Sequence, residues 1–151
     1  MIRPVRAAWA LAVAAALLTS GCGGGGGAKL AYIKSANQIC AQTATRVKAL
    51  PPANDASGVV AHLQQLATVM RDQAAALRQV PPPQKDASTI EGMIQQIELT
   101  SASLAAAATS KNQRDESGAT ANLARASAAI RAANTAASRY GLTQCGSVTP
   151  G

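Results

Sequence analysis

The chain has 151 residues, enough for one domain with a modest hydrophobic core. It is basic, with a formal net charge of +7, but it contains only two tyrosines, one tryptophan and no phenylalanine. Because the basic residues are scattered and few rings can stack on bases, the composition argues against nucleic-acid binding.

The N-terminal segment, residues 1–21, has the organisation of an export signal. Arg3 and Arg6 form a positive flank, residues 7–18 are apolar, and small residues follow. An apolar run of this length is too short to span a bilayer comfortably as a permanent helix. A membrane anchor and a buried helix are the alternatives, but neither explains both flanks of the run. We therefore predict that residues 1–21 are a signal peptide.

The end of this segment resembles the lipobox of bacterial lipoproteins. In Leu18-Thr19-Ser20-Gly21-Cys22, small residues precede a cysteine, and Thr19 stands where that family most often has Leu. The resemblance implies cleavage between Gly21 and Cys22, a diacylglyceryl group on the Cys22 thiol, and acylation, for example by palmitate, of the new amino terminus. Two or three acyl chains hold a protein far more firmly than one. The predicted location is the cell membrane, with the protein lipid-anchored and facing the extracytoplasmic side.

Glycines dominate the stretch that follows the leader. Gly21, Gly23 and Gly26 match the G-x-G-x-x-G pattern of dinucleotide-binding loops, but that function needs a preceding strand and an acidic residue about 20 positions later. The first acidic residue of the chain is Asp55. We therefore interpret residues 22–28 as the lipidated cysteine and a flexible tether, with a reach of about 12 Å for five glycines.

The first two predicted helices each carry one apolar face. The first runs from about residue 29 to 49, and the second starts at the N-cap candidate Asp55 and ends before the prolines at 81–83. One polar residue interrupts each face, Asn37 in the first and Gln73 in the second. The apolar or small positions are Leu30, Ile33, Cys40, Ala44 and Val47, and then Val59, Leu63, Leu66, Met70 and Leu77.

The third and fourth predicted helices are separated by a polar loop at residues 110–118. The third opens with the capping-box spacing from Ser88 to Glu91, and Asp115 is placed to cap the fourth. The fourth ends at Gly141, which suits the left-handed conformation after a helix. The apolar positions are Ile90, Ile94, Ile97, Leu104 and Ala108, with Ser101 in register, and then Leu123, Ala126, Ile130, Ala133, Ala137 and Tyr140.

Short connections make consecutive helices antiparallel, and the alternation typical of strands is nearly absent. The predicted fold is therefore all-α: an up-down-up-down four-helix bundle over residues 29–146, followed by a disordered C-terminal tail at 147–151. Many inward positions are alanine, which buries little apolar area, so such a bundle benefits from a covalent staple.

The cysteines can supply that staple. If Cys22 is lipidated, Cys40 and Cys145 remain, and an oxidising compartment favours a disulfide between them. The start of the first helix lies beside the end of the fourth in this topology, but residues 141–144 must fold back along the bundle to reach Cys40. Two free buried thiols are the alternative.

A second resemblance covers the folded part. The sequences Asn-Gln-Ile-Cys, ending at Cys40, and Tyr-Gly-Leu-Thr-Gln-Cys, ending at Cys145, are similar to those of small uncharacterised secreted helical lipoproteins from high-GC bacteria. The likeness in architecture spans the chain after the leader. It implies a disulfide-closed helical bundle and transfers no catalytic residue.

Residues suited to catalysis or metal binding are sparse. A single histidine, His62, cannot build a di-metal bundle site, and with Cys40 and Cys145 bridged no set of soft ligands remains for zinc or copper. Glu91 and Glu98 lie at the flank of one helix face, where we expect them to be solvated. A nucleophile would need a base and an orienting group, and His62 is the only base of the usual kind. We predict no catalytic residue, no metal and no cofactor.

Two functions of different classes remain. The first is a non-catalytic binding or interaction module of the cell envelope, anchored through Cys22 and contacting an envelope protein or polymer. Its candidate contacts are Arg125, Arg131 and Arg139. The alternative is a small-ligand carrier with an apolar pocket of about 300 Å³ or more between the helices. Its polar lining, or equally a set of internal hydrogen bonds, would come from Asn37, Gln73 and Ser101.

Overall fold

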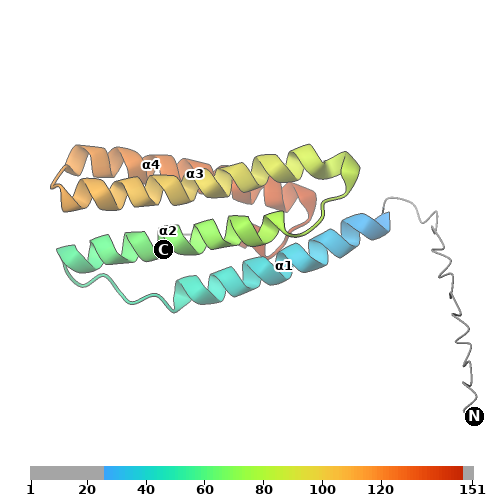
Figure 1. The fold of residues 1–151 in the computed structure, drawn as a ribbon, viewed down its shortest axis with the longest axis horizontal. Helices are drawn as coiled ribbons and strands as arrows, with labels where there is room; N and C mark the ends of the chain where they lie inside the picture. The colour runs from blue at the N-terminus through green and yellow to red at the C-terminus, as the bar shows by residue number, and fades with distance from the viewer. Residues whose placement is uncertain (1–25, 148–151) are drawn as a thin grey trace, which may run out of the picture.

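The computed structural model describes residues 26–147, which form four antiparallel helices (Figure 1). The helices are α1 (Gly26–Lys48), α2 (Ala56–Arg78), α3 (Ala87–Asn112) and α4 (Glu116–Tyr140), with short 3₁₀ helices η1 (Gln84–Asp86) and η2 (Cys145–Ser147). The described residues contain no strand. The predicted all-α four-helix bundle is confirmed.

The ends of the folded part differ slightly from the predicted boundaries. Helix α1 begins at Gly26, so residues 26–28, which we expected in the tether, are helical. Extending an existing helix by a few residues adds one hydrogen bond per residue, which is far easier than starting one. Ser147, expected in the tail, belongs to η2.

The connection between α3 and α4 is much shorter than the predicted loop at residues 110–118. Only three residues, 113–115, separate the two helices. Arg114 takes the left-handed conformation, with φ 60°, and the Asp115 carboxylate accepts a hydrogen bond of 2.9 Å from the Gly118 amide. A tight turn with a good N-cap lets both helices continue through polar residues, whose exposure does not prevent helix formation.

The capping box predicted at Ser88 is wrong, although the cap predicted at Asp55 is confirmed. Asp55 accepts a hydrogen bond of 2.7 Å from the Gly58 amide. Helix α3 instead starts one residue before Ser88, directly after η1, and its N-cap residue Asp86 makes no capping hydrogen bond. The Asp86 carboxylate accepts a hydrogen bond of 2.8 Å from the Tyr140 hydroxyl, so a contact with α4 replaces the local cap.

Helix α3 lies at the centre of the packing, between α2 and α4, whereas α1 packs on α2 and η2. The predicted apolar faces of α2, α3 and α4 are confirmed at their centres. The residues of those faces that are buried are Leu63, Met70, Leu77, Ile90, Ile94, Ile97, Leu104, Ala108, Ala126, Ile130, Ala133, Ala137 and Tyr140. Three others, Val59, Leu66 and Leu123, are partly buried at the edge of the core.

The predicted buried face of α1 is wrong in part. Leu30 is 68% exposed, and Ile33 and Val47 are only partly buried. The residues that face the core are Tyr32, Ala36, Cys40 and Thr43. They repeat at helical spacing, but only one is large and apolar, so hydrophobicity alone favours the neighbouring face.

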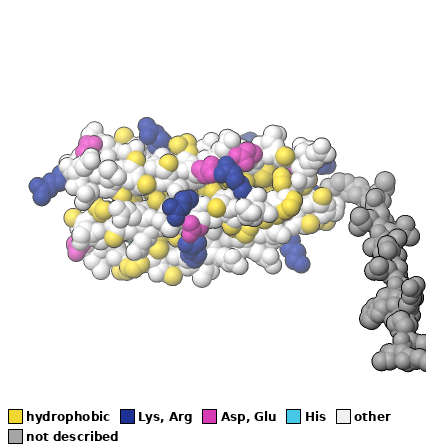
Figure 2. Space-filling model, in the orientation of Figure 1, with side chains coloured by type: hydrophobic (Ala, Val, Ile, Leu, Met, Phe, Trp, Pro, Cys, Tyr) yellow, Lys and Arg dark blue, Asp and Glu magenta, His cyan; other side chains and the backbone are white. Residues whose placement is uncertain are grey.

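Charged side chains lie at the outer surface, and on the face shown in Figure 2 most of the lysines and arginines stand apart from one another. Arg125, Arg131 and Arg139 are all exposed along α4. Within residues 26–147 none of the three pairs with a carboxylate, and Arg125 donates a hydrogen bond of 3.2 Å to Asn122. They do not form one binding stripe, because their spacings of six and eight residues place them on different sides of the helix.

Helix α4 ends in a left-handed glycine, as predicted. Gly141 has φ 100°, and its amide donates to the Ser138 carbonyl at 3.1 Å. The Leu142 amide donates to the Ala137 carbonyl at 2.8 Å, which completes a Schellman motif. Leu142 is fully buried, so this turn directs the C-terminal segment back toward α1.

Two glycine-to-alanine substitutions should change stability in opposite directions. Gly141→Ala should lower the free energy of unfolding by about 1–2 kcal/mol, because a side chain strains the left-handed conformation. Gly92→Ala should raise it by about 0.5–1 kcal/mol, because Gly92 lies within α3 and a Cβ there meets nothing within 4 Å. Urea denaturation of both variants measures the two values. Equal stability of Gly141→Ala and the unsubstituted protein would contradict the role of this turn.

Candidate functional site

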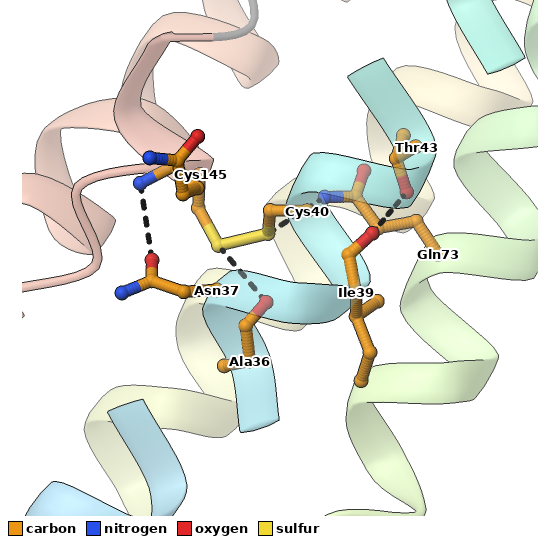
Figure 3. Close-up of a disulfide and its surroundings, with 8 residues drawn as sticks. Ala36, Asn37, Ile39, Cys40, Thr43, Gln73 and Cys145 are labelled. Atoms are coloured by element: carbon orange, nitrogen blue, oxygen red, sulfur yellow. Dashed lines mark hydrogen bonds between the residues drawn. A yellow bond between two sulfur atoms is a disulfide. The ribbon is translucent and has the colours of Figure 1, made fainter. Parts of the chain in front are cut away.

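A buried disulfide joins α1 to the segment that follows α4 (Figure 3). The Cα atoms of Cys40 and Cys145 are 5.0 Å apart, although the residues are 105 positions apart in the sequence. Neither cysteine is more than 5% exposed. The predicted pairing and the predicted fold-back of residues 141–144 are both confirmed. The other predicted site, with cleavage after Gly21 and lipidation of Cys22, lies outside the described residues.

Polar side chains hold the segments on both sides of this disulfide (Figure 3). The Asn37 carboxamide oxygen accepts a hydrogen bond of 3.0 Å from the Gln144 amide, which ties α1 to the C-terminal segment. The side chain of Gln73, which lies in α2, donates a hydrogen bond of 3.2 Å to Cys40 Sγ. Farther along the bundle, the Ser101 hydroxyl donates to the Ala67 carbonyl at 2.7 Å, which links α3 to α2. The three polar residues expected in a ligand pocket therefore all make contacts between segments.

A small cavity lies beside Gln73 in the interior of the bundle. It has a volume of about 10 Å³ and is lined by residues of α2, α3 and α4 together with Cys145. Gln73 is 4% exposed, and its carboxamide oxygen has no hydrogen-bond partner among the described residues. A cavity of this volume suits one water molecule, whereas pockets for small ligands have about 300 Å³ or more.

Two tyrosines join α1, α4 and η1 at one end of the bundle. The rings of Tyr32 and Tyr140 meet edge to face, with centroids 5.9 Å apart. The Tyr140 hydroxyl donates to the Asp86 carboxylate, and the Lys29 ammonium lies 4.5 Å from the centroid of the Tyr140 ring. Such ring pairs and cation–π contacts stabilise a fold beyond the area that they bury. We call these four residues the tyrosine junction.

Burial of the tyrosine junction keeps both phenols neutral. It raises the pKa of Tyr32 to about 12. It also raises the pKa of Tyr140, and the hydrogen bond to the negative Asp86 carboxylate raises that pKa further. Phenols that resist ionisation in this way stay protonated, and the one of Tyr140 donates a hydrogen bond to Asp86.

Glu91 and Glu98 lie at the flank of α3, but they are paired as well as solvated. Both carboxylates accept hydrogen bonds from Arg78 of α2, with a distance of 2.7 Å to Glu91 and 3.0 Å between Nη2 and the second oxygen of Glu98. The guanidinium holds the pKa of Glu91 below its usual value. A lowered pKa is the opposite of what a general acid needs at neutral pH.

His62 contacts the backbone of the α1–α2 connection. Its Nδ1 atom lies 2.9 Å from the Pro51 carbonyl oxygen, which can only accept a hydrogen bond, so Nδ1 carries the proton. The described residues contain no group of three or more His, Cys, Asp or Glu side chains that could hold a metal ion. Met70 and Met93, by contrast, fill the core.

A surface groove of about 480 Å³ runs between the end of α1 and the first half of α2. Apolar side chains, including Leu50 and Val69, lie beside the amides of Gln64 and Gln65. Arg46 lies at one edge and donates a hydrogen bond of 2.7 Å to Asp72, whose pKa it lowers. None of the polar residues that we expected in a ligand pocket lines this groove.

No protein-family model, curated protein or solved structure matches this chain. Among the described helices, none combines the length and apolar character needed to cross a bilayer.

Sequence reasoning missed the tyrosine junction and the pairing of Arg78. Tyr32 and Tyr140 are the only tyrosines of the chain, and the predicted topology already placed them at the same end of the bundle. Pairing these two rings was therefore possible from the sequence. The Arg78 contacts depend on the rotation of α2 against α3, which no local pattern specifies.

Removing the disulfide should release α1 before the other helices. In the double variant Cys40→Ala/Cys145→Ala, the free energy of unfolding should fall by several kcal/mol, with about 4.7 kcal/mol as the upper bound for a loop of roughly 100 residues. Amide protons of α1 should exchange faster than those of α2, α3 and α4, because α1 packs mainly on α2 and η2 at the edge of the bundle. Urea denaturation and hydrogen-exchange mass spectrometry measure both effects.

Cys22→Ala is the matched control, since it removes a cysteine and leaves the disulfide intact. It should unfold at the same urea concentration as the unsubstituted protein. Equal acceleration of exchange in all four helices of the double variant would show that the disulfide does not act chiefly on α1.

Both tyrosines should titrate well above pH 10 in the folded protein. Because each folded pKa is raised, the stability that these phenols contribute is complete below pH 10, the ordinary tyrosine pKa, and is lost as the pH rises toward 12. Near-ultraviolet phenolate absorbance reports only these two residues. A titration midpoint near 10 in the native protein, as in denaturant, would contradict their burial.

Single substitutions distinguish the two tyrosines. Tyr140→Phe removes the hydrogen bond to Asp86 and should lower the free energy of unfolding by about 1 kcal/mol or more. Tyr32→Phe removes a buried hydroxyl that has no partner among the described residues, so it should not be destabilising.

Proposed function

We propose that this protein is a membrane-tethered lipoprotein that acts on the extracytoplasmic side as a non-catalytic binding module of the cell envelope. The observation that carries the proposal is the arrangement of the three cysteines. Cys40 and Cys145 are joined in a buried disulfide, which leaves Cys22 as the remaining thiol. Cys22 follows a leader of the export type and stands four positions before Gly26, the first residue that the structure describes.

The disulfide also supports the proposed compartment. Disulfides persist in oxidising environments and are rare where thiols are kept reduced. Export to such an environment therefore suits this bundle, in which the Cys40–Cys145 bond fastens the first helix to the C-terminal segment.

A role in binding rather than catalysis agrees with how the ionisable side chains are used. His62 contacts a backbone carbonyl, Glu91 and Glu98 share Arg78, and both tyrosines resist ionisation. No described side chain combines a shifted pKa with an open pocket, which is the usual signature of a catalytic centre.

A binding module of this shape would use its outer surface. The groove between α1 and α2 offers apolar side chains beside the exposed amides of Gln64 and Gln65, a mixture that suits a protein segment or a polymer. The carrier alternative has less support, because the interior cavity of about 10 Å³ accommodates no ligand larger than water.

Mass spectrometry of the protein purified from its native membrane tests the anchor. The intact mass should correspond to a chain that begins at Cys22 and carries acyl chains, and a peptide map should contain the Cys40–Cys145 link. The Cys22→Ala variant is the control and should leave the membrane fraction. An intact leader with an unmodified Cys22 would overturn the proposal.

Crosslinking in the intact envelope of the native cells tests the binding role. A photoreactive side chain in place of Gln65 should capture a specific protein or polymer, and one in place of exposed Thr120 on α4 should not. Failure to capture any specific partner from either position would count against a binding module and leave the anchor standing.

A further inference from the structure

We propose that the end of the bundle where α1 begins is seated on anionic phospholipid headgroups. The contact is made by the basic side chains of Lys34, Lys85 and Arg139 and by the exposed Leu30. This inference rests on the lipid anchor at Cys22 proposed above. It adds a defined orientation and a second membrane contact to that anchor.

Three chain segments meet at this end of the bundle, which we call the proximal end. They are the first turns of α1, the connection between α2 and α3, and the end of α4 (Figure 1). The tyrosine junction binds them together, because Lys29 and Tyr32 of α1 contact Tyr140 of α4, which in turn contacts Asp86 of η1. The proximal end is therefore a connected surface.

The covalent chain keeps the proximal end close to any lipid on Cys22. Four residue steps separate Cys22 from Gly26, the first residue of α1, and a fully extended chain covers at most about 14 Å in that distance. The Debye length at physiological ionic strength is about 8 Å. The proximal end can therefore approach the headgroups to within this distance, whereas the opposite end is farther by the length of α2, about 34 Å.

The proximal end carries basic charge that acidic neighbours do not balance. Among the described residues, Lys34, Lys85 and Arg139 form no ion pair. The one carboxylate among these segments, Asp86, is engaged by Tyr140. Anionic lipid surfaces attract such basic groups, and the attraction falls off within a Debye length.

The opposite end of the bundle is balanced, and we call it the distal end. Its basic residues stand among three carboxylates, two of which cap helices and one of which, Glu116, pairs with Lys111. The basic residues are Lys48, Lys111 and Arg114, and the acidic residues are Asp55, Asp115 and Glu116. Because of this difference, the proximal end is the one that an anionic surface attracts.

Leu30 supplies the apolar part of the contact. It is 68% exposed, and it lies four residues before Lys34, so both side chains share one side of α1. That side differs from the buried one formed by Tyr32 and Ala36. Interfacial segments combine an apolar side chain that enters the headgroup region with flanking cations that stay at its surface.

A tryptophan in place of Leu30 measures this contact directly. The only tryptophan of the chain, Trp9, lies in the leader, so the lipidated protein that begins at Cys22 has no other indole. The Leu30→Trp protein is reconstituted into vesicles of phosphatidylcholine with and without phosphatidylglycerol, in which the acyl chains carry a bromine quencher. Indole fluorescence should be quenched several-fold more in the anionic vesicles.

Leu99→Trp is the matched control, because Leu99 is also an exposed leucine, at 41%, but lies in the middle of α3. Its fluorescence should be the same with and without the quencher. A triple variant, Lys34→Gln/Lys85→Gln/Arg139→Gln, should lose most of the Leu30→Trp quenching. The triple variant Lys48→Gln/Arg114→Gln/Arg131→Gln, which removes the same charge elsewhere, should keep it.

Vesicle flotation distinguishes the failure of this inference from the failure of the anchor. If the protein floats with the vesicles but Leu30→Trp and Leu99→Trp are quenched equally, or if the two triple variants behave alike, the proposed orientation is wrong and the anchor stands. If the protein does not float and Cys22 is unmodified, the proposed function itself is wrong. Equal quenching in both kinds of vesicle would overturn the requirement for anionic headgroups.

Discussion

The Cys40–Cys145 disulfide is the bond on which the position of α1 depends. Helices α2, α3 and α4 pack side by side with α3 in the centre, and α1 contacts them mainly through α2, η2 and the ring of Tyr140. Three of the four largest fully buried side chains, Tyr32, Leu142 and Cys40, lie where α1 meets the C-terminal segment. Alanine supplies much of the remaining inward surface and buries little area per residue. The covalent link therefore compensates for a short supply of large apolar side chains.

Tyr140 has a comparable role in the polar contacts, because one side chain connects three elements. Its hydroxyl contacts Asp86, its ring face lies under Lys29 and its ring meets Tyr32. The carboxylate that could have capped α3 is thereby used in a tertiary contact instead. A local cap contributes about 1 kcal/mol, and a hydrogen bond to a charged group contributes a similar amount or more. Replacing the local cap with this tertiary hydrogen bond therefore costs α3 little stability and fixes the end of α4.

The fold was predictable from the sequence wherever one face of a helix carried large apolar residues. Ile90, Ile94 and Ile97 leave α3 only one orientation, and assigning Cys22 to a lipid favoured the pairing of Cys40 with Cys145 over two free thiols. The orientation of α1 was not predictable in the same way, because its buried face contains Ala36 and Thr43 while Leu30 points outward. Local patterns also fail where a distant residue competes for the same atom. Asp86 and Tyr140 are 54 residues apart, and nothing near Ser88 reveals their contact.

The acidic side chains are used in contacts within the fold, and this leaves the surface with an excess of positive charge. Every one of the seven acidic residues has a structural partner: two cap helices, four pair with arginine or lysine, and Asp86 accepts from Tyr140. The basic residues outnumber the acidic ones, so cations remain on the surface without a carboxylate partner among the described residues. Carboxylates that are already engaged make poor acids, bases or metal ligands, whereas unpaired cations attract external anions over a Debye length. The electrostatic contact that we propose would therefore depend on the lysines and arginines of the bundle, which suit an anionic surface better than a basic one.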